Sequence, residues 1–215
     1  MSAWVKKSYS GMGVSIAYSL YCPSDTNGEN VPIAIYFCPS YNCMKIPEKL
    51  THESWQCKHP SFVLVPDCTT QTHWNEPIPG KALHDLIFML SRKYNIDVCQ
   101  VYLIGNGNGA DIVWYLISHY PRFFAAAIPI AGCADPYMAR NAKYVPIWAF
   151  HAVDDDITSP LGSGLDGHAC PCGSKRLVDA LQTVGSQLVK YTKLYPVKRT
   201  RERVAFKPTS PVYGR

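Results

Sequence analysis

The chain of 215 residues is 47% hydrophobic and 17% charged, which suits one folded domain and excludes disorder over most of its length. No apolar run approaches the roughly 20 residues that span a bilayer, and the N-terminus lacks the apolar stretch of a secretory signal. We therefore expect a cytoplasmic protein without a membrane span. The nine cysteines, an odd number, predict reduced thiols rather than a disulfide framework.

The formal net charge of +5 is concentrated near the C-terminus, while the rest of the chain is close to neutral. The basic residues that crowd there are Lys190, Lys193, Lys198, Arg199, Arg201, Arg203 and Lys207. Hydrophobic patterning stops after Pro196, so we predict a folded domain over residues 1–197 and a basic tail over residues 198–215. One short basic run is typical of a solvated tail, and we expect no nucleic-acid partner.

Apolar runs of strand length alternate along the chain with segments of helical periodicity. Strands are predicted over residues 14–21, 33–37, 61–66, 101–104, 125–131, 146–150 and 189–195. Helices are predicted over residues 81–94, 111–120 and 175–181, and a polar loop with two prolines over residues 69–80. The alternation favours a mostly parallel, doubly wound sheet with helices on both faces, which is a three-layer α/β sandwich.

Three sequence blocks add a resemblance. The chain carries Gln100-Val-Tyr-Leu-Ile-Gly before a glycine-rich turn, then His119-Tyr-Pro-Arg-Phe-Phe, then Val145-Pro-Ile-Trp-Ala-Phe-His. Over roughly residues 14–196 it resembles the esterase branch of the α/β hydrolases, which includes predicted peptidases, feruloyl-esterase-like and polyhydroxybutyrate-depolymerase-like enzymes. The resemblance implies an α/β-hydrolase fold. Because the final helix of the family is not found, it also implies a fold truncated at the C-terminus.

The resemblance further implies acyl transfer by a serine, a histidine and an aspartate, with backbone N–H groups that stabilise the oxyanion. Aligned on its glycines, the turn Gly105-Asn106-Gly107-Asn108-Gly109 places Gly107 where the nucleophilic serine would stand. Glycine has no side chain that could form an acyl-enzyme, but it tolerates the strained backbone of such a turn. We predict a tight strand-to-helix turn with a positive φ at Gly107 and no nucleophile.

The loop that supplies an oxyanion donor is altered too. After the predicted strand over residues 33–37 the family has a His-Gly pair, whereas this chain has Cys38-Pro39. Pro39 lacks an N–H group, so one donor is missing, and Asn108 offers the other backbone donor. A thiol needs a nearby base to act as a nucleophile, and we interpret Cys38 as a buried, unreactive residue.

Of the acid and the base, only the acid is found. Asp155 aligns with the triad acid of the family, and a solvated turn or a helix N-cap is the alternative interpretation of this residue. No histidine follows His168, where the family carries its base. His151 matches a structural histidine of the family, so we interpret it as part of the core.

We interpret the chain as a non-catalytic, esterase-like pseudoenzyme. Its cleft, lined by the glycine-rich turn and by Cys38-Pro39, would bind a small acyl- or ester-like ligand or a protein partner. Two related alternatives stay open: a hydrolase of carboxylic esters or peptides with displaced catalytic residues, and a truncated form of an active hydrolase.

An alternative of another class is a dinucleotide-binding protein, because the turn that starts at Gly105 also fits the pattern G-x-G-x-x-A. Asp135 would be its acidic partner, but three predicted strands precede the turn, and a dinucleotide-binding domain usually carries it on the first strand. A group of potential metal ligands is spaced too closely for a usual zinc site, so we expect neither metal nor cofactor. These ligands are His168, Cys170 and Cys172.

Overall fold

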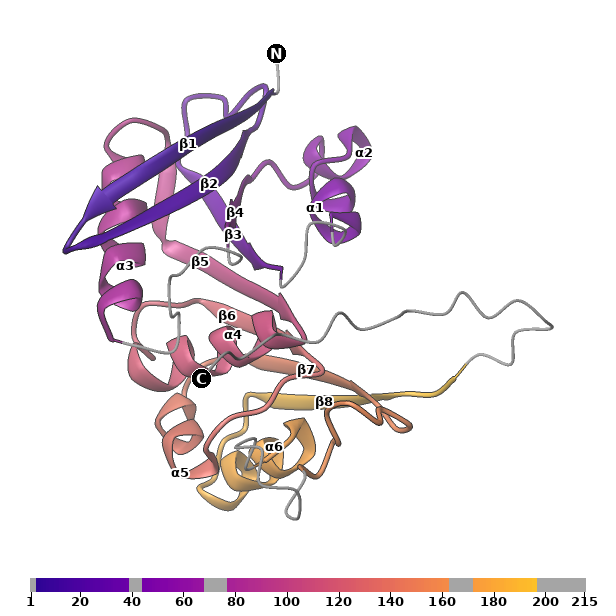
Figure 1. Cartoon of the computed structure of the whole chain (residues 1–215). Coiled ribbons are helices and arrows are strands. Elements are labelled where there is room, and N and C mark those ends of the chain that lie inside the picture. The colour runs from indigo at the N-terminus through magenta and orange to yellow at the C-terminus, as the bar shows by residue number, and fades with distance from the viewer. Residues whose placement is uncertain (1–2, 39–43, 68–76, 163–171, 197–215) are drawn as a thin grey trace, which may run out of the picture.

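The computed structural model describes residues 3–38, 44–67, 77–162 and 172–196; Pro39, His168, Cys170 and the basic tail lie outside this part. The described strands form one eight-stranded sheet in the order β1-β2-β4-β3-β5-β6-β7-β8 (Figure 1). The strands are β1 (Ala3–Gly11), β2 (Val14–Cys22), β3 (Val31–Phe37), β4 (Phe62–Pro66), β5 (Ile96–Asn106), β6 (Ala126–Ile130), β7 (Ile147–Ala152) and β8 (Val189–Leu194).

The sheet is mostly parallel, as predicted. The neighbours from β4 through β3, β5, β6 and β7 to β8 all run parallel, and β2 joins β4 antiparallel. The unpredicted strand β1 forms a hairpin with β2. This hairpin turns at Met12 and Gly13, whose φ angles of 54° and 78° suit the right-handed twist of the two strands.

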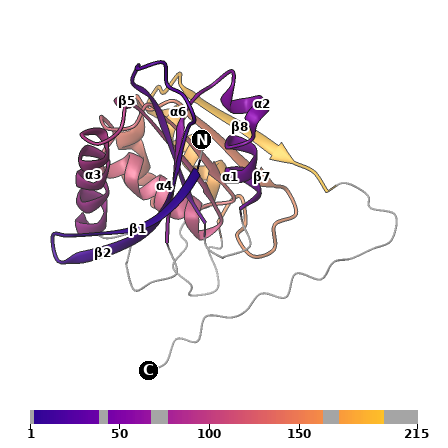
Figure 2. The ribbon, with the colours of Figure 1, turned by 90° about the horizontal axis from the view of Figure 1, so that it is seen from above.

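Helices cover both faces of the sheet, which confirms the three-layer α/β architecture. Figure 2 shows α3 and α4 on one side of the sheet and α1 and α2 on the other. The helices are α1 (Lys45–Leu50), α2 (Glu53–Gln56), α3 (Pro77–Ser91), α4 (Asn108–His119), α5 (Pro136–Ala139) and α6 (Ser174–Thr183), with a 3-10 turn η1 (Arg140–Ala142) after α5. Among these helices none is long and apolar enough to cross a membrane.

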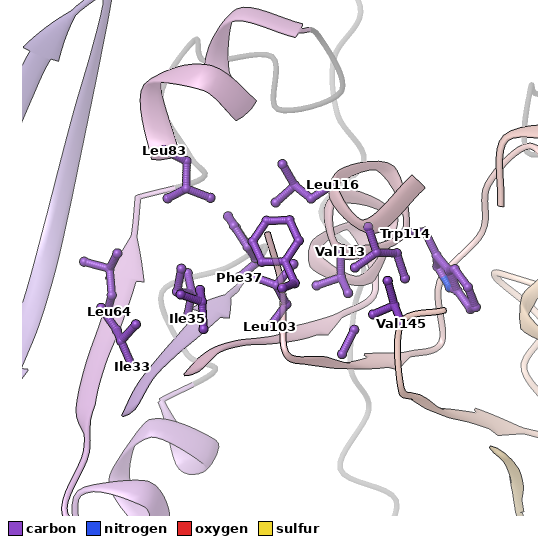
Figure 3. Close-up of a cluster of buried hydrophobic side chains, with 14 of the residues drawn as sticks. Ile33, Ile35, Phe37, Leu64, Leu83, Leu103, Val113, Trp114, Leu116 and Val145 are labelled. Carbon is purple, nitrogen blue, oxygen red and sulfur yellow. The ribbon is translucent and has the colours of Figure 1, made fainter. Parts of the chain in front are cut away.

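The main hydrophobic core lies between the sheet and the helices α3, α4 and α6. Successive side chains of a strand point to opposite faces, so Ile33, Ile35 and Phe37 of β3 enter this core together. Leu83 of α3 and Leu116 of α4 reach it from the helical side (Figure 3). A smaller cluster on the opposite face includes Tyr36 of β3 and Ile104 of β5, against which α1 packs its apolar residues.

The order of the strands creates a topological switch point. From β3 the chain passes through α1 and α2 to β4 on one side, and from β4 it passes through α3 on the other face to β5, which then pairs with β3. The connections therefore diverge at the carboxyl ends of β3 and β5. In open α/β sheets, ligands bind at such a switch point. Cys38 follows β3 there, and the glycine-rich turn follows β5.

Candidate functional site

Gly107 forms the turn between β5 and α4. Its φ of 54° and ψ of −126° lie outside the regions that side-chain-bearing residues usually adopt, and its N–H donates to the carbonyl of Ile130 at 2.9 Å. The tight turn with a positive φ that the sequence predicts is therefore present. Gly107 has no side chain, and the expectation that it occupies the nucleophile position of an acyl-transfer enzyme stays a prediction.

The two outer glycines of the motif allow backbone to pack on backbone. A Cβ atom on Gly105 would lie 2.2 Å from the carbonyl oxygen of Gly109. A Cβ atom on Gly109 would lie 2.1 Å from the carbonyl oxygen of Phe37, at the end of β3. Both distances are far shorter than contact, so the turn can rest against β3 only because these residues are glycines.

The two asparagines of the turn have different surroundings. Asn106 ends β5, lies beside Ile130 of β6 and is half-buried, whereas Asn108 is exposed at the first position of α4. The N–H groups of the first helical turn have no partner within the helix. The N–H groups of Asn108 and Gly109 therefore belong to the positive end of α4, which favours negatively polarised oxygen atoms.

Cys38 lies at the same switch point of the sheet, directly after β3. It forms an isolated parallel bridge with Asp67 and is 8% exposed. Its burial agrees with the interpretation of an inert thiol at a strand end. The predicted contribution of Pro39 lies outside the described residues and stays a prediction.

Asp155, in the loop that follows β7, lies beside His151, which is near the end of β7. The Oδ1 atom of Asp155 accepts hydrogen bonds from the N–H groups of Ile157 at 3.1 Å and Thr158 at 2.9 Å. Its Oδ2 atom lies 3.5 Å from Nε2 of His151, which is fully buried. Because the carbonyl oxygen of Thr158 can only accept, Nε2–H of His151 is the donor of their 2.7 Å hydrogen bond.

Among the described residues, no hydrogen bond or ion pair joins the loop that carries Asp155 to the turn at Gly107. Asp155 bonds to its own loop, and His151 bonds to the end of that loop. The expectation that His151 belongs to the core agrees with its burial. The role of Asp155 as a remnant triad acid stays a prediction, and its hydrogen bonds match the alternative role, a turn residue that accepts backbone N–H groups.

No family model and no curated protein matches the sequence. Among solved structures, a thermostable esterase has 28% sequence identity and a TM-score of 0.74, over 89% of this chain and 54% of that chain. This chain has the α/β-hydrolase fold. The predicted resemblance to the esterase and peptidase branch is thereby confirmed.

Other solved structures with the α/β-hydrolase fold are more distant in sequence. An acylaminoacyl peptidase of Pyrococcus horikoshii has 10% identity and a TM-score of 0.66, over 89% of this chain and 37% of that chain. An S-formylglutathione hydrolase of Agrobacterium tumefaciens has 11% identity and a TM-score of 0.60, over 91% of this chain and 86% of that chain. The chain thus spans about half the length of the thermostable esterase and about a third of the peptidase.

A half-buried carboxyl group that the sequence analysis did not single out lies in the first turn of α4. Asp111, in the first turn of α4, accepts a hydrogen bond from the N–H of Cys133 at 2.7 Å. Burial raises the pKa of the Asp111 carboxyl from its ordinary 3.8 to about 6, and the hydrogen bond from Cys133 opposes that rise. In the sequence, only the spacing could have pointed to Asp111: it lies four residues after Gly107, and residues four apart share one face of a helix.

In the dinucleotide alternative, which stays a prediction, Asp135 would be the acidic partner. Asp135 caps α5, because its Oδ1 atom accepts a hydrogen bond from the N–H of Tyr137 at 2.8 Å. A group of three or more histidine, cysteine or acidic residues that could hold a metal is not found among the described residues, which include only Cys172 of the three predicted ligands. The expectation of neither metal nor cofactor stays a prediction.

The expectation of reduced thiols is wrong at one position. Cys133, in the segment between β6 and α5, is disulfide-bonded. A disulfide requires two Cα atoms within about 7 Å, and sequence spacing alone does not reveal which cysteines the fold brings that close.

We expect Asp155→Ala to lower the free energy of unfolding by about 1 kcal/mol, because two backbone N–H groups of the loop lose their acceptor. Chemical denaturation of the purified variant measures this loss. Asp154→Ala is the matched control, since Asp154 is exposed in the same loop, and its effect should stay within about 0.5 kcal/mol. Equal effects of the two substitutions would show that Asp155 does not hold the loop.

Proposed function

We propose that this chain is a non-catalytic α/β-hydrolase-fold protein, an esterase-like pseudoenzyme whose crevice binds a small acyl- or ester-like ligand. The observation that carries the proposal is the glycine at the turn. Gly107 has the backbone conformation of the turn, with φ 54° and ψ −126°, but it offers no atom that could attack a carbonyl carbon.

The histidine nearest to the candidate acid, His151 of β7, is hydrogen-bonded to the loop that follows its own strand. For His151 to act as a general base, its ring would have to reach the group it deprotonates, within about 3.2 Å or through one water. Instead the ring is fully buried, and its Nε2–H is donated to Thr158. A chain without nucleophile and base retains binding and backbone donors, but it has no route to an acyl-enzyme.

The backbone N–H groups at the start of α4 favour binding of a carbonyl or carboxylate oxygen. The turn places Asn108 and Gly109 in the first turn of α4, at the switch point of the sheet. Donors at a helix N-terminus bind a polarised oxygen atom whether or not a bond is later broken. Binding of a ligand without its hydrolysis therefore needs only these backbone N–H donors.

The alternative function is an active hydrolase of carboxylic esters or peptides, with a nucleophile displaced from the turn. The similarity to a thermostable esterase at 28% identity favours this alternative. It would need an activated hydroxyl or thiol elsewhere at the crevice. The buried thiol of Cys38 is the described candidate, at the end of β3.

Labelling with a fluorophosphonate separates these functions. We expect purified protein to show no stoichiometric label and no turnover of p-nitrophenyl butyrate, because the turn carries no activated hydroxyl. Gly107→Ser alone should give no burst of p-nitrophenol, since a serine without a base is a weak nucleophile. The double variant Gly107→Ser with Asp155→Ala is its control. Stoichiometric labelling of the unmodified chain, or turnover by Gly107→Ser that the second substitution abolishes, would establish a hydrolase.

The binding half of the proposal depends on one backbone donor. Asn108→Pro removes the N–H at the first position of α4, where proline is tolerated, and Asn108→Ala keeps it. Titration of butyrate, followed by nuclear magnetic resonance shifts, should give weak binding to the alanine variant and a loss of at least about tenfold for the proline variant, as expected for a lost charge-assisted hydrogen bond. Equal affinities for the two variants would exclude this donor.

A further inference from the structure

The segment that follows β6, residues 131–134, contacts the beginnings of two helices. We call these four residues the β6 junction. The N–H of Cys133 donates to Oδ1 of Asp111, in the first turn of α4, at 2.7 Å. The N–H of Ala134 donates to the carbonyl oxygen of Cys172, shortly before α6 begins, at 3.1 Å. The junction therefore links the start of α4 to the start of α6.

Gly132 brings the β6 junction into direct contact with both helices. A Cβ atom on Gly132 would lie 2.5 Å from the Cβ atom of Ala110 and 3.2 Å from the backbone nitrogen of Asp111. On the side of α6, the carbonyl oxygen of Gly132 accepts a hydrogen bond from Oγ of Ser174, which is fully buried, at 3.0 Å. Close-packed groups transmit displacements to their neighbours, so a shift of the junction also shifts the first turn of α4.

The disulfide of this chain is attached to the same junction. Cys133 is disulfide-bonded, and it forms an isolated antiparallel bridge with Gly173. The other cysteines that the structure describes are free thiols: Cys22, Cys38, Cys57, Cys99 and Cys172. The cysteine to which Cys133 is bonded therefore lies outside the described residues.

One disulfide beside several free thiols is the pattern of a bond that responds to redox conditions. Secreted domains that depend on disulfides for stability carry several of them, whereas the rare disulfides of proteins with reduced thiols are usually transient, catalytic or redox-sensing. Reduction also requires that an attacking thiol reach the sulfur atoms. Cys133 is half-buried and does not belong to the hydrophobic core, which favours such access.

We propose that the disulfide of Cys133 is a redox switch that controls the stability of the first turn of α4. In the oxidised state the bond holds the β6 junction against Ala110 and Asp111. In the reduced state two small-molecule thiols have formed one disulfide between them, and the S–S bond of Cys133 has become two thiol groups. The junction is then held only by its hydrogen bonds and packing, so the start of α4 opens more often.

The switch would act on the donors that the proposed function uses. Asn108 and Gly109 lie in the same turn of α4 as Ala110 and Asp111. If the proposed function holds, a carboxylate ligand binds more tightly to the oxidised chain than to the reduced chain. Only this effect on binding rests on the proposed function, because the link between the junction and α4 can be measured without a ligand.

The test compares backbone hydrogen exchange of the oxidised chain with that of the chain reduced by dithiothreitol. The amides of Ala110 and Asp111 both donate to the carbonyl oxygen of Gly107, and their exchange should become at least about tenfold faster on reduction. The amide of Val31, which donates to the carbonyl oxygen of Asn95 at the start of β3, should keep its rate. Alkylation and mass spectrometry verify the redox state of each sample.

Two variants separate the disulfide from other effects of the reductant. Cys133→Ser should show fast exchange at Ala110 and Asp111 with and without dithiothreitol, because its junction has no disulfide to reduce. Cys99→Ser is the matched control, since Cys99 is an exposed free thiol of β5, and it should respond to dithiothreitol as the unmodified chain does. If Cys133→Ser does not fold, the two redox states of the unmodified chain still decide the test.

Three results would overturn the switch. Equal exchange at Ala110 and Asp111 in both redox states would show that the disulfide does not act on α4. Faster exchange at Val31 as well would show that the bond stabilises the whole fold. A bond that stays intact in excess reduced glutathione would be a permanent cross-link.

Butyrate titration of both redox states tests the effect on binding separately. Tighter binding to the oxidised chain supports both the switch and the proposed function. Exchange that responds to reduction while butyrate binds to neither state would support the switch and contradict the proposed function.

Discussion

Gly109→Ala is expected to lower the free energy of unfolding by about 3 kcal/mol or more, at or beyond the upper end of the effects of overpacking. The added Cβ would stand 2.1 Å from the carbonyl oxygen and 2.7 Å from the carbonyl carbon of Phe37. Both atoms are backbone of a central strand, so relief requires that β3 and α4 move apart. Urea denaturation of the purified variant measures the loss.

Gly28→Ala separates this clash from the general cost of replacing a glycine. Gly28 has a φ of 76°, and a Cβ there would meet no atom within 4 Å. Its replacement should cost about 1 kcal/mol from backbone strain alone. Similar losses for the two variants would mean that the contact between Gly109 and Phe37 does not hold the turn against β3.

Asp111→Asn is expected to raise stability at neutral pH by up to about 3 kcal/mol, because the pKa of Asp111, raised by burial to about 6, lies roughly two units above its ordinary value. Between about pH 4 and pH 6 the folded state keeps a proton that the unfolded state has released. The free energy of unfolding therefore falls as pH rises through this window. Asparagine does not ionise, and its side-chain oxygen can still accept the N–H of Cys133.

The measurement is the difference between the unfolding free energies of variant and unmodified chain at pH 4 and pH 7. It should be near zero at pH 4 and approach its full value by pH 7. Asp25→Asn is the control, since this exposed aspartate also accepts one backbone N–H, that of Asn27 at 2.7 Å. A difference for Asp111→Asn that does not change with pH would show that its carboxyl group titrates as an exposed one does.

The buried strands were predictable because both of their faces are apolar. The predicted runs over residues 33–37 and 61–66 correspond closely to β3 and β4. The start of β5 was missed, since Asp97, Cys99 and Gln100 interrupt the apolar pattern, although they extend the strand back to Ile96. Sequence periodicity detects a strand through burial, and in this part of β5 only Ile96 is buried.

Other elements were hidden by their residue types. The β1 strand contains two adjacent lysines, and most of its described side chains are exposed, so tertiary pairing with β2 decides its conformation. The α3 helix begins at Pro77, inside the predicted loop. A proline in the first turn lacks only an N–H that would have no intrahelical partner, so Pro77 and Pro79 begin the helix instead of breaking it.

At the candidate site, sequence spacing predicted the turn but not its surroundings. The positive φ of Gly107 follows from a local pattern of glycines between a strand and a helix. The contacts of Asp111 with Cys133, and of His151 with Thr158, depend on where loops return in space.

The contact between Gly109 and Phe37 also bears on how the chain folds. It joins the end of β3 to the start of α4, and all of α1, α2, β4, α3 and β5 lies between these two positions in the chain. Contacts between residues far apart in the chain form slowly, because the entropy of loop closure is lost before the contacts can stabilise the chain. We therefore expect this contact to form late, after the local hairpin of β1 and β2. A spectroscopic probe at Asn108 would report the final step of folding, and one at Met12 an early step.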